Sequence, residues 1–304
     1  MHKILVLSTV IFLVASCHRR ENQIYKKDGK YHLRFNPPDS STYHYNTSSE
    51  TFLTIAENGT VIGMHRTSRF SVNYLISKDS NEFILEMTFE GINYQEKHDP
   101  NIRKTDTADT LQLIRDNLLN EMKGGTFFVR VRPVGQLIST GGVQELVNAV
   151  MKSYYAEADI PQASTYWGEW ADQEQWKNLH PFVWVMLDSA RRMGDHWTDT
   201  STNNEDINFK INQRFQFDTI IAGMATIRSQ GRISNDRAGT WLSGNRVTGI
   251  LSGDEFGRSI IDTATGMPGE MEDSVSVEGN VQIEGHNARL KIIKTLKMTG
   301  RKIK

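Results

Sequence analysis

Histidine and aspartate side chains between residues 180 and 206 are the part of the sequence whose types suit metal chemistry. The candidate ligands for a transition metal are His180, Asp188, Asp195 and His196, and those for calcium are Asp195, Asp199 and Asp206. Zinc sites use closely spaced Cys and His ligands, and calcium loops use regularly spaced acids around a loop glycine. The spacing matches neither pattern, so these residues read as ordinary polar groups, and we predict no metal and no cofactor.

Catalytic motifs are missing from the sequence. It has none of the short patterns of metalloproteases, serine hydrolases, phosphate-binding loops or dinucleotide-binding turns. The single cysteine, Cys17, is predicted below to be modified by lipid, which excludes a Cys–His nucleophile. Catalytic groups usually converge from distant positions, so a hydrolase with an unrecognised site stays open as an alternative. The prediction is a non-catalytic protein.

Cys17 ends the run Leu13-Val14-Ala15-Ser16-Cys17, which looks like the lipobox of a bacterial lipoprotein. A basic start and the apolar stretch Ile4–Val14 have the form of a signal peptide, and this stretch is shorter than the about 20 residues that a membrane-spanning helix needs. We predict that residues 1–16 are removed and that acyl chains on Cys17 anchor the protein to a membrane, at about 0.8 kcal/mol per buried CH₂. The alternative is an ordinary secretory signal with a cysteine near the cut by chance.

Composition limits the class of the remaining chain. Residues 17–40 are mostly polar and are predicted to form the lipidated N-terminus and a tether, and residues 41–304 a single β-rich body domain. The formal net charge is −1, so neither a nucleic-acid groove nor a polybasic membrane patch has support. With Cys17 lipidated no thiol is left for a disulfide, and packing alone must hold the fold.

Period-two alternation of apolar and polar residues dominates the body. We predict three long strands joined by hairpins over Tyr43–Glu96, and strands near residues 209–217, 220–230, 240–251, 256–265, 274–283 and 289–298. Turns are expected at Asn58-Gly59, at Ser80-Asn81, at Asp218 and at Gly253-Asp254. Spacings of three and four predict amphipathic helices over Thr107–Lys123 and Val143–Ala158.

Strands outnumber helices and do not alternate with them, which indicates an α+β, β-dominated fold. Strands with one apolar face must be covered. We therefore expect one large curved antiparallel sheet, resembling a half-barrel, with two or more helices packed on its concave face.

An aromatic segment between Tyr154 and Trp197 is the one stretch that suggests a binding site. Its candidate ligand-binding residues are Tyr166, Trp167, Trp170, Trp176 and Trp184. Aromatic faces offer large contact areas at low entropic cost, so these residues could line a pocket for an acyl chain or stack on a sugar. The alternative, which we favour because large aromatic residues dominate ordinary cores too, is that they cap the open edge of the sheet core. Pro161 and Pro181 are expected to interrupt any long helix here.

Several short stretches, together with the lipobox, resemble an uncharacterised family of Bacteroidota lipoproteins built on a domain of unknown function. These stretches are residues 33–37 and 43–45, Val131-Arg132-Pro133-Val134-Gly135, residues 194–197 and residues 262–266. The expected body is similar to that of periplasmic lipoprotein carriers, whose half-barrels shelter acyl chains. Surface-exported members of such families tend to carry acidic residues after the cysteine. This chain has His18-Arg19-Arg20, which favours the periplasmic side of the outer membrane.

Three functions remain open from the sequence. The first, which we predict, is a periplasmic, outer-membrane-anchored lipoprotein that binds a hydrophobic or amphipathic ligand or a cell-envelope partner. The second is a structural or assembly component of the outer membrane without a ligand cavity. The third is the envelope hydrolase named above. A pocket beside the aromatic segment would favour the first, and an exposed apolar patch the second.

Overall fold

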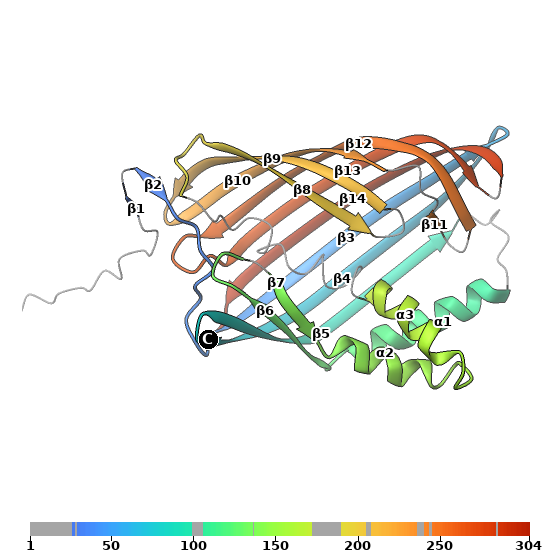
Figure 1. Cartoon of the computed structure of the whole chain (residues 1–304), viewed down its shortest axis with the longest axis horizontal. Coiled ribbons are helices and arrows are strands. Elements are labelled where there is room, and N and C mark those ends of the chain that lie inside the picture. Colours follow the sequence, from blue (N-terminus) through green and yellow to red (C-terminus); the bar gives the residue numbers. More distant parts are fainter. Residues whose placement is uncertain are drawn as a thin grey trace, which may run out of the picture.

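The computed structural model describes residues 26–27, 29–98, 106–135, 137–171, 190–204, 208–235, 240–242, 245–283 and 285–304. Within these residues, twelve strands form one antiparallel sheet and three helices lie together near one end of it (Figure 1). The chain order of the elements is β1 (Lys26–Lys27), β2 (Lys30–Tyr31), β3 (Thr42–Glu57), β4 (Thr60–Asp79), β5 (Glu82–His98), α1 (Asp106–Met122), β6 (Thr126–Val131), β7 (Leu137–Gly141), α2 (Val143–Met151), α3 (Ile160–Ala171), β8 (His196–Asn204), β9 (Asn208–Ile221), β10 (Met224–Ser234), β11 (Thr240–Leu242), β12 (Asn245–Asp262), β13 (Pro268–Ile283) and β14 (His286–Lys302).

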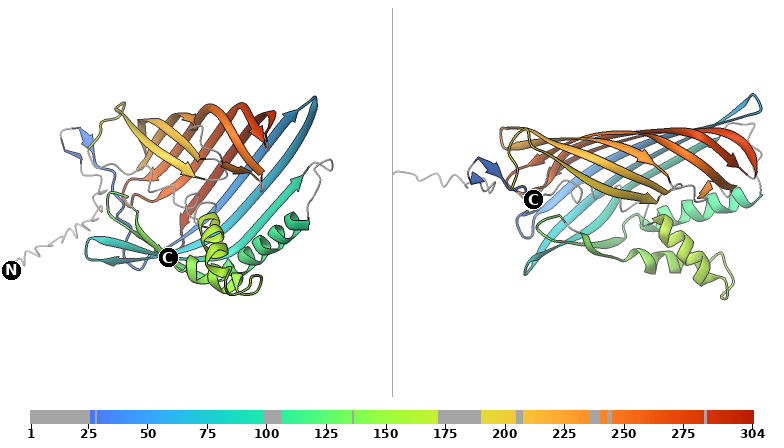
Figure 2. Two further views of the ribbon diagram at one scale, coloured as in Figure 1. Left: turned by 45° about the vertical axis from the view of Figure 1, so that its right-hand side comes forward. Right: turned by 45° about the horizontal axis from the view of Figure 1, so that its top comes forward.

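The main sheet is open. Its strand order is β7-β6-β5-β4-β3-β14-β13-β12-β10-β9-β8, and β11 pairs with β12 outside this path. Most neighbouring strands are joined by hairpins. The pairing of β14 with β3 joins the last strand of the main sheet to the first one in chain order. The sheet curves strongly along this order, as the two further views show (Figure 2). Strands β1 and β2 form a separate two-stranded ladder.

Alternation along the strands explains why they form. In β4 the buried side chains are Phe70, Val72, Tyr74 and Ile76, and the residues between them are more exposed. Side chains of a strand point to opposite faces in turn, so this pattern buries one face of the sheet. The predicted hairpin at Asn58-Gly59 is confirmed, and both residues have positive φ angles, 48° and 80°, as a two-residue turn requires.

Two predicted turns are wrong. Gly253 lies inside β12, which merges the predicted strands 240–251 and 256–265 into one. A Cβ at Gly253 would overlap the backbone carbonyl oxygen of Ser276 on β13, so this glycine permits a close approach of strands and ends none. Asp218 lies within β9, where its carboxylate accepts a hydrogen bond from Arg228, and the turn comes later, at Ala222 and Gly223.

The helices match the sequence in part. The predicted helix Thr107–Lys123 is confirmed as α1, but the predicted helix Val143–Ala158 ends at Met151. There the backbone N–H of Tyr154 and Tyr155 both donate to the carbonyl of Met151, which closes the helix in tight turns. Helix α3 was not predicted. Its Pro161 falls in the first turn, where proline is tolerated because no N–H is needed.

Buried residues form two apolar clusters. The larger cluster joins strands with all three helices through residues such as Ile114, Val147 and Trp167. It also includes Leu33 and Phe35, from the segment that the sequence assigns to the tether. The smaller one, which we call the strand-only cluster, consists of Leu53, Met64, Val247, Leu251, Val281, Ala288 and Leu290. The predicted β-dominated fold with one large antiparallel sheet is thus confirmed.

Among the described residues, helices are too short or too polar to cross a membrane.

Candidate functional site

Both apolar clusters lie on one face of the main sheet, which we call the apolar face. Along β3, the odd-numbered Tyr43 and Tyr45 belong to the larger cluster and Leu53 to the strand-only cluster. Pairing of β3 with β4 has no register shift between these positions, so all three side chains point the same way. Helix residues contribute to the larger cluster, whereas the described members of the strand-only cluster all come from strands.

Polar residues cross the apolar face between the two clusters. Direct backbone pairing lines up Glu96 of β5, Arg66 of β4, Thr51 of β3, Lys294 of β14, Val275 of β13, Glu255 of β12, Gly231 of β10 and Gln213 of β9. On β14, Lys294 separates Ile292, beside the strand-only cluster, from Met298 in the larger cluster. We call the polar members of this row, with the adjoining Asp273, Ser229, Tyr94 and Arg115, the polar belt.

Glu255 is the centre of the belt. Its side chain is only 3% exposed. Gln213 Nε2 donates to Glu255 Oε2 at 2.8 Å, and Ser229 Oγ donates to Oε1 at 3.1 Å. Gly231 leaves room for this arrangement, because a Cβ at this position would overlap Glu255 Oε2 and displace the carboxyl group. Three strands therefore cooperate to hold one buried carboxyl group.

Two oxygen atoms beside Glu255 are buried and have no hydrogen-bond partner among the described residues. They are Oδ1 of Asp273 and Oε1 of Gln213. Buried polar atoms are nearly always paired in folded proteins, because an unpaired one loses its hydrogen bonds to water without replacement. Both atoms are acceptors, so this part of the belt has a surplus of acceptors and needs donors.

A proton meets part of this need. The pKa of Asp273 is raised to about 7. Burial is the largest cause, the negative charge of Glu255 and a hydrogen bond with its carboxyl group add to the rise, and Lys294 and the backbone of Ser274 act in the opposite direction. A proton shared by the two carboxyl groups supplies a donor that neither has when ionised. Near neutral pH the pair therefore changes its charge.

The other end of the belt is an ion-pair group that ties α1 to the sheet. Glu96 Oε2 accepts hydrogen bonds from Arg66 Nε at 3.1 Å, from Arg115 Nη1 at 3.0 Å and from the Tyr94 hydroxyl at 2.9 Å. The Arg115 guanidinium carbon also lies 4.3 Å from the centre of the Tyr94 ring. Arg115 is on α1, so this group fixes the helix at the edge of the belt.

Of the five predicted aromatic residues, one has a side chain among those described. Trp167 is 4% exposed and packs in the larger cluster. Tyr166 and Trp170 belong to α3, but their side chains are not among those described. Trp176, Trp184 and Cys17 lie outside the described residues. The structure therefore places one of the five, and places it as a packed residue.

Three of the residues considered as metal ligands, Asp195, His196 and Asp199, are among the described ones. Asp195 accepts the backbone N–H of Arg192, and Asp199 accepts that of Thr200, as turn and strand residues often do. His196 is exposed at the start of β8, and His180, Asp188 and Asp206 are not described. No cluster of three or more metal-ligating side chains occurs in the described part of the chain.

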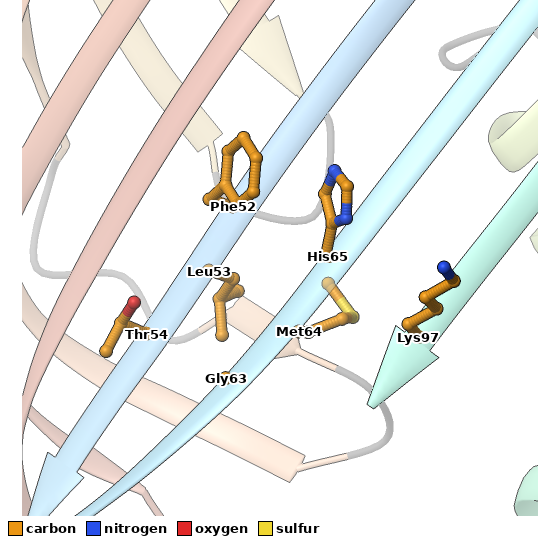
Figure 3. Close-up of a pocket in the computed structure, with 7 residues that line it drawn as sticks. All are labelled: Phe52, Leu53, Thr54, Gly63, Met64, His65 and Lys97. Atoms are coloured by element: carbon orange, nitrogen blue, oxygen red, sulfur yellow. The ribbon is translucent and has the colours of Figure 1, made fainter. Parts of the chain in front are cut away.

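A shallow pocket of about 260 Å³ lies close to the hairpin at which β3 ends and β4 begins (Figure 3). It is lined by Phe52, Leu53, Thr54, Gly63, Met64, His65 and Lys97. Phe52, Thr54 and His65 point to the face opposite the apolar face, because they alternate with the buried Leu53 and Met64. Pairing with β5 stops at His98, opposite Met64, while β3 and β4 continue.

On the face opposite the apolar face, a serine, a histidine and a carboxylate also lie next to one another in space. Ser71 Oγ lies 3.4 Å from His44 Nε2, and His44 Nδ1 lies 3.5 Å from Glu90 Oε2. His44 Nδ1 makes its closer contact, 2.9 Å, with Asn73 Oδ1. Ser71 lies inside β4, paired with β3 and β5, and not on a turn where backbone amides converge, so we assign no oxyanion hole to it. We therefore read this arrangement as a surface hydrogen-bond network.

A family model matches residues 80–268, more than half of the chain, and its description is a family of unknown function, DUF6263. The chain belongs to this family. The matched segment of this DUF6263 protein contains Glu96, Gln213 and Glu255, while Thr51, Asp273 and Lys294 lie outside it. No curated protein matches the chain.

Solved structures give only distant likenesses. A structure titled for lipid–protein interactions in lipovitellin has 8% identity and a TM-score of 0.48 over 88% of this chain, which spans 26% of the lipovitellin chain. An outer membrane channel from Pseudomonas putida F1 has 7% identity and a TM-score of 0.24, covering 91% of this chain and 99% of the channel. A DUF1329 family protein from Desulfovibrio piger has 11% identity and a TM-score of 0.15, with 83% and 84% covered. With TM-scores below 0.5, these likenesses decide neither fold nor function.

Proposed function

We propose that this DUF6263 protein is a non-catalytic lipoprotein that holds a hydrophobic or amphipathic ligand against the apolar face of its sheet. One observation carries the proposal: the polar belt, with two unpaired buried acceptors, crosses the apolar face between two apolar clusters. A core that served packing alone would gain from apolar side chains in these positions, because buried charges are costly. A ligand with an apolar part and a polar group fits such a surface.

The two parts of the ligand have separate places in this proposal. The strand-only cluster receives the apolar part, because its described members are apolar side chains on the same face of the sheet as the belt. Hydroxyl or N–H groups of the ligand donate to Asp273 Oδ1 and Gln213 Oε1. The helices cover the neighbouring part of the concave side of the sheet.

The location completes the proposal. Acyl chains on Cys17 would hold the body at the outer membrane on its periplasmic side, where lipids and other amphipathic molecules are abundant. We propose no cofactor, no nucleic-acid partner and no catalytic step. A structural component of the outer membrane without a ligand is the alternative that the experiments below separate from ligand binding.

The test uses two adjacent residues of β13 that point to opposite faces. Val275 lies in the row of the belt and is half-buried, while Ser274 is exposed on the other face. Val275→Phe adds volume inside the proposed site, and Ser274→Phe adds the same ring outside it. Binding of a fluorescent long-chain monoacylglycerol, whose head is uncharged and carries hydroxyl donors, should weaken at least about tenfold in Val275→Phe, equivalent to about 1.4 kcal/mol, and remain unchanged in Ser274→Phe.

Circular dichroism and a thermal melt establish that both variants are folded. Equal affinity of the two variants and the wild type would contradict binding at the belt. A wild type that binds neither the monoacylglycerol nor any extracted envelope lipid would contradict the proposed function and favour the structural alternative.

A further inference from the structure

The pocket close to the hairpin between β3 and β4 is a hollow on the surface formed by strands β3, β4 and β5 (Figure 3). Gly63 opens it, because a Cβ at this position would meet no atom nearer than Leu53 O at 3.9 Å. Gly63 has no positive φ angle that would require glycine there. The missing side chain thus leaves space next to Thr54, its partner across the strands. The volume of about 260 Å³ is just below the range of about 300–1,000 Å³ for sites of drug-sized ligands, so a small ligand is expected.

Three side chains form one wall of this hollow. Phe52 of β3, His65 of β4 and Lys97 of β5 are directly paired neighbours, and they lie side by side in the close-up (Figure 3). The Phe52 and His65 rings are stacked, with centroids 4.2 Å apart and planes 5° from parallel. Phe52 nevertheless remains 43% exposed, which is high for a large apolar residue. Because the two rings cover each other's inner faces, the apolar surface that this wall offers to an incoming ring is the exposed outer side of Phe52.

The charge of the pocket is positive. Lys97 is the one residue with a permanent charge among the seven described lining residues, and none of the seven is acidic. His65 Nε2 is buried and has no hydrogen-bond partner among the described residues. A bound group that supplies a partner for this nitrogen would remove the cost of leaving it unpaired. A cation and an unpaired imidazole nitrogen on the same wall suit a carboxylate or another small anionic group.

We propose that this pocket binds a small organic anion that carries a flat ring. The ring lies against Phe52 and His65 in the space left by Gly63, and the anionic group pairs with Lys97. The pocket is on the face opposite the polar belt, so this site is independent of the proposed lipid-binding function and either one can fail alone.

The experiment titrates the purified full chain with benzoate and follows the imidazole signals by nuclear magnetic resonance, with calorimetry for the affinity. Acetate provides the charge without the ring, and benzyl alcohol the ring without the charge. Benzoate should bind at least about tenfold more tightly than either probe, because only benzoate uses both parts of the wall.

Variants locate the binding. Gly63→Val fills the hollow without a backbone clash, and Lys97→Gln removes the charge; each should weaken benzoate binding about tenfold. Lys210→Gln, at an exposed position of β9, is the matched control and should leave the affinity unchanged. Melting temperatures establish that each variant is folded. Absence of saturable benzoate binding in the wild type, equal affinity in all four proteins, or acetate binding as tightly as benzoate would each overturn the proposal.

Discussion

Replacing Asp273 by asparagine should remove a pH-dependent loss of stability. The folded-state pKa of Asp273 is raised from 3.8 to about 7, so the folded protein binds this proton more tightly than the unfolded chain does. The resulting stabilisation is complete below pH about 4 and disappears as the pH rises through about 7. Its full size is at most about 4 kcal/mol, from about 3 pKa units at 1.36 kcal/mol each.

Between pH 5 and pH 8 the wild type should therefore lose up to about 3 kcal/mol of unfolding free energy through this group. The Asp273→Asn variant keeps a neutral side chain of the same shape, and its amide can donate to Glu255 at every pH. It should match the wild type at pH 5 within about 1 kcal/mol and exceed its stability at pH 8.

Urea unfolding at both pH values, with the free energy extrapolated to zero urea, measures the effect. Asp254→Asn is the matched control: Asp254 precedes Glu255 on β12, points to the opposite face and lies 3.4 Å from Arg232 Nε. This control should keep the wild-type pH dependence. If Asp273→Asn loses stability between pH 5 and pH 8 as steeply as the wild type, the buried acid pair does not hold a proton and the reasoning fails.

Three further predictions follow from single residues. Trp167→Ala should lower the unfolding free energy by about 3–5 kcal/mol, because the ring is 4% exposed in the larger cluster; a near-wild-type melting temperature would contradict a packing role. Gly253→Ala should destabilise the protein because its Cβ would overlap the Ser276 carbonyl. Gly63→Ala, whose Cβ would make only an ordinary contact with Leu53 O at 3.9 Å, should not. Equal melting temperatures of the two variants would refute the close approach of β12 and β13. Cys17→Ala should release the protein from membranes or leave an uncleaved precursor, which fractionation and detergent partitioning measure; a mature-size band that stays with the membrane would show that the anchor is elsewhere.

Much of the sheet could be predicted from local patterns. Strand β4 shows the alternation of Phe70, Val72, Tyr74 and Ile76 in the sequence itself, and the turn at Asn58-Gly59 has residues that favour positive φ angles. The errors arose at residue types that occur both in turns and inside regular elements. Gly253-Asp254 has the composition of a turn, but Gly253 serves the packing of one strand against the next. Pro161 suggested an interruption and instead occupies the first turn of α3.

The polar belt could not be predicted, because its members meet only through the register of strands that are distant in the sequence. Glu96, Lys294 and Gln213 become parts of one row by pairing across β3, β4, β10, β12, β13 and β14. A weaker signal was present within single strands. Lys294 interrupts the alternating apolar residues Leu290, Ile292, Leu296 and Met298 on the buried face of β14. A charge on the apolar side of a long strand thus marks a position to examine for function.

The aromatic segment shows the limit of composition as a guide to function. Its tryptophans were candidates for ligand binding because aromatic side chains are common in binding sites, but they are also common in cores, which is the interpretation that the sequence favoured. Trp167 lies in the core, and the two unpaired acceptors beside Glu255 lie elsewhere, on β9 and β13. The register that brings these atoms together with the buried Glu255 therefore indicates a different candidate site from the one that residue type suggested.

Native mass spectrometry of the body without its lipid anchor, purified from envelope extracts, tests the central claim most directly. The account predicts a population with an added mass that corresponds to an amphipathic molecule, and loss of this population in Val275→Phe but not in Ser274→Phe. A wild-type protein that carries only its own mass after exposure to envelope lipids would contradict ligand binding on the apolar face.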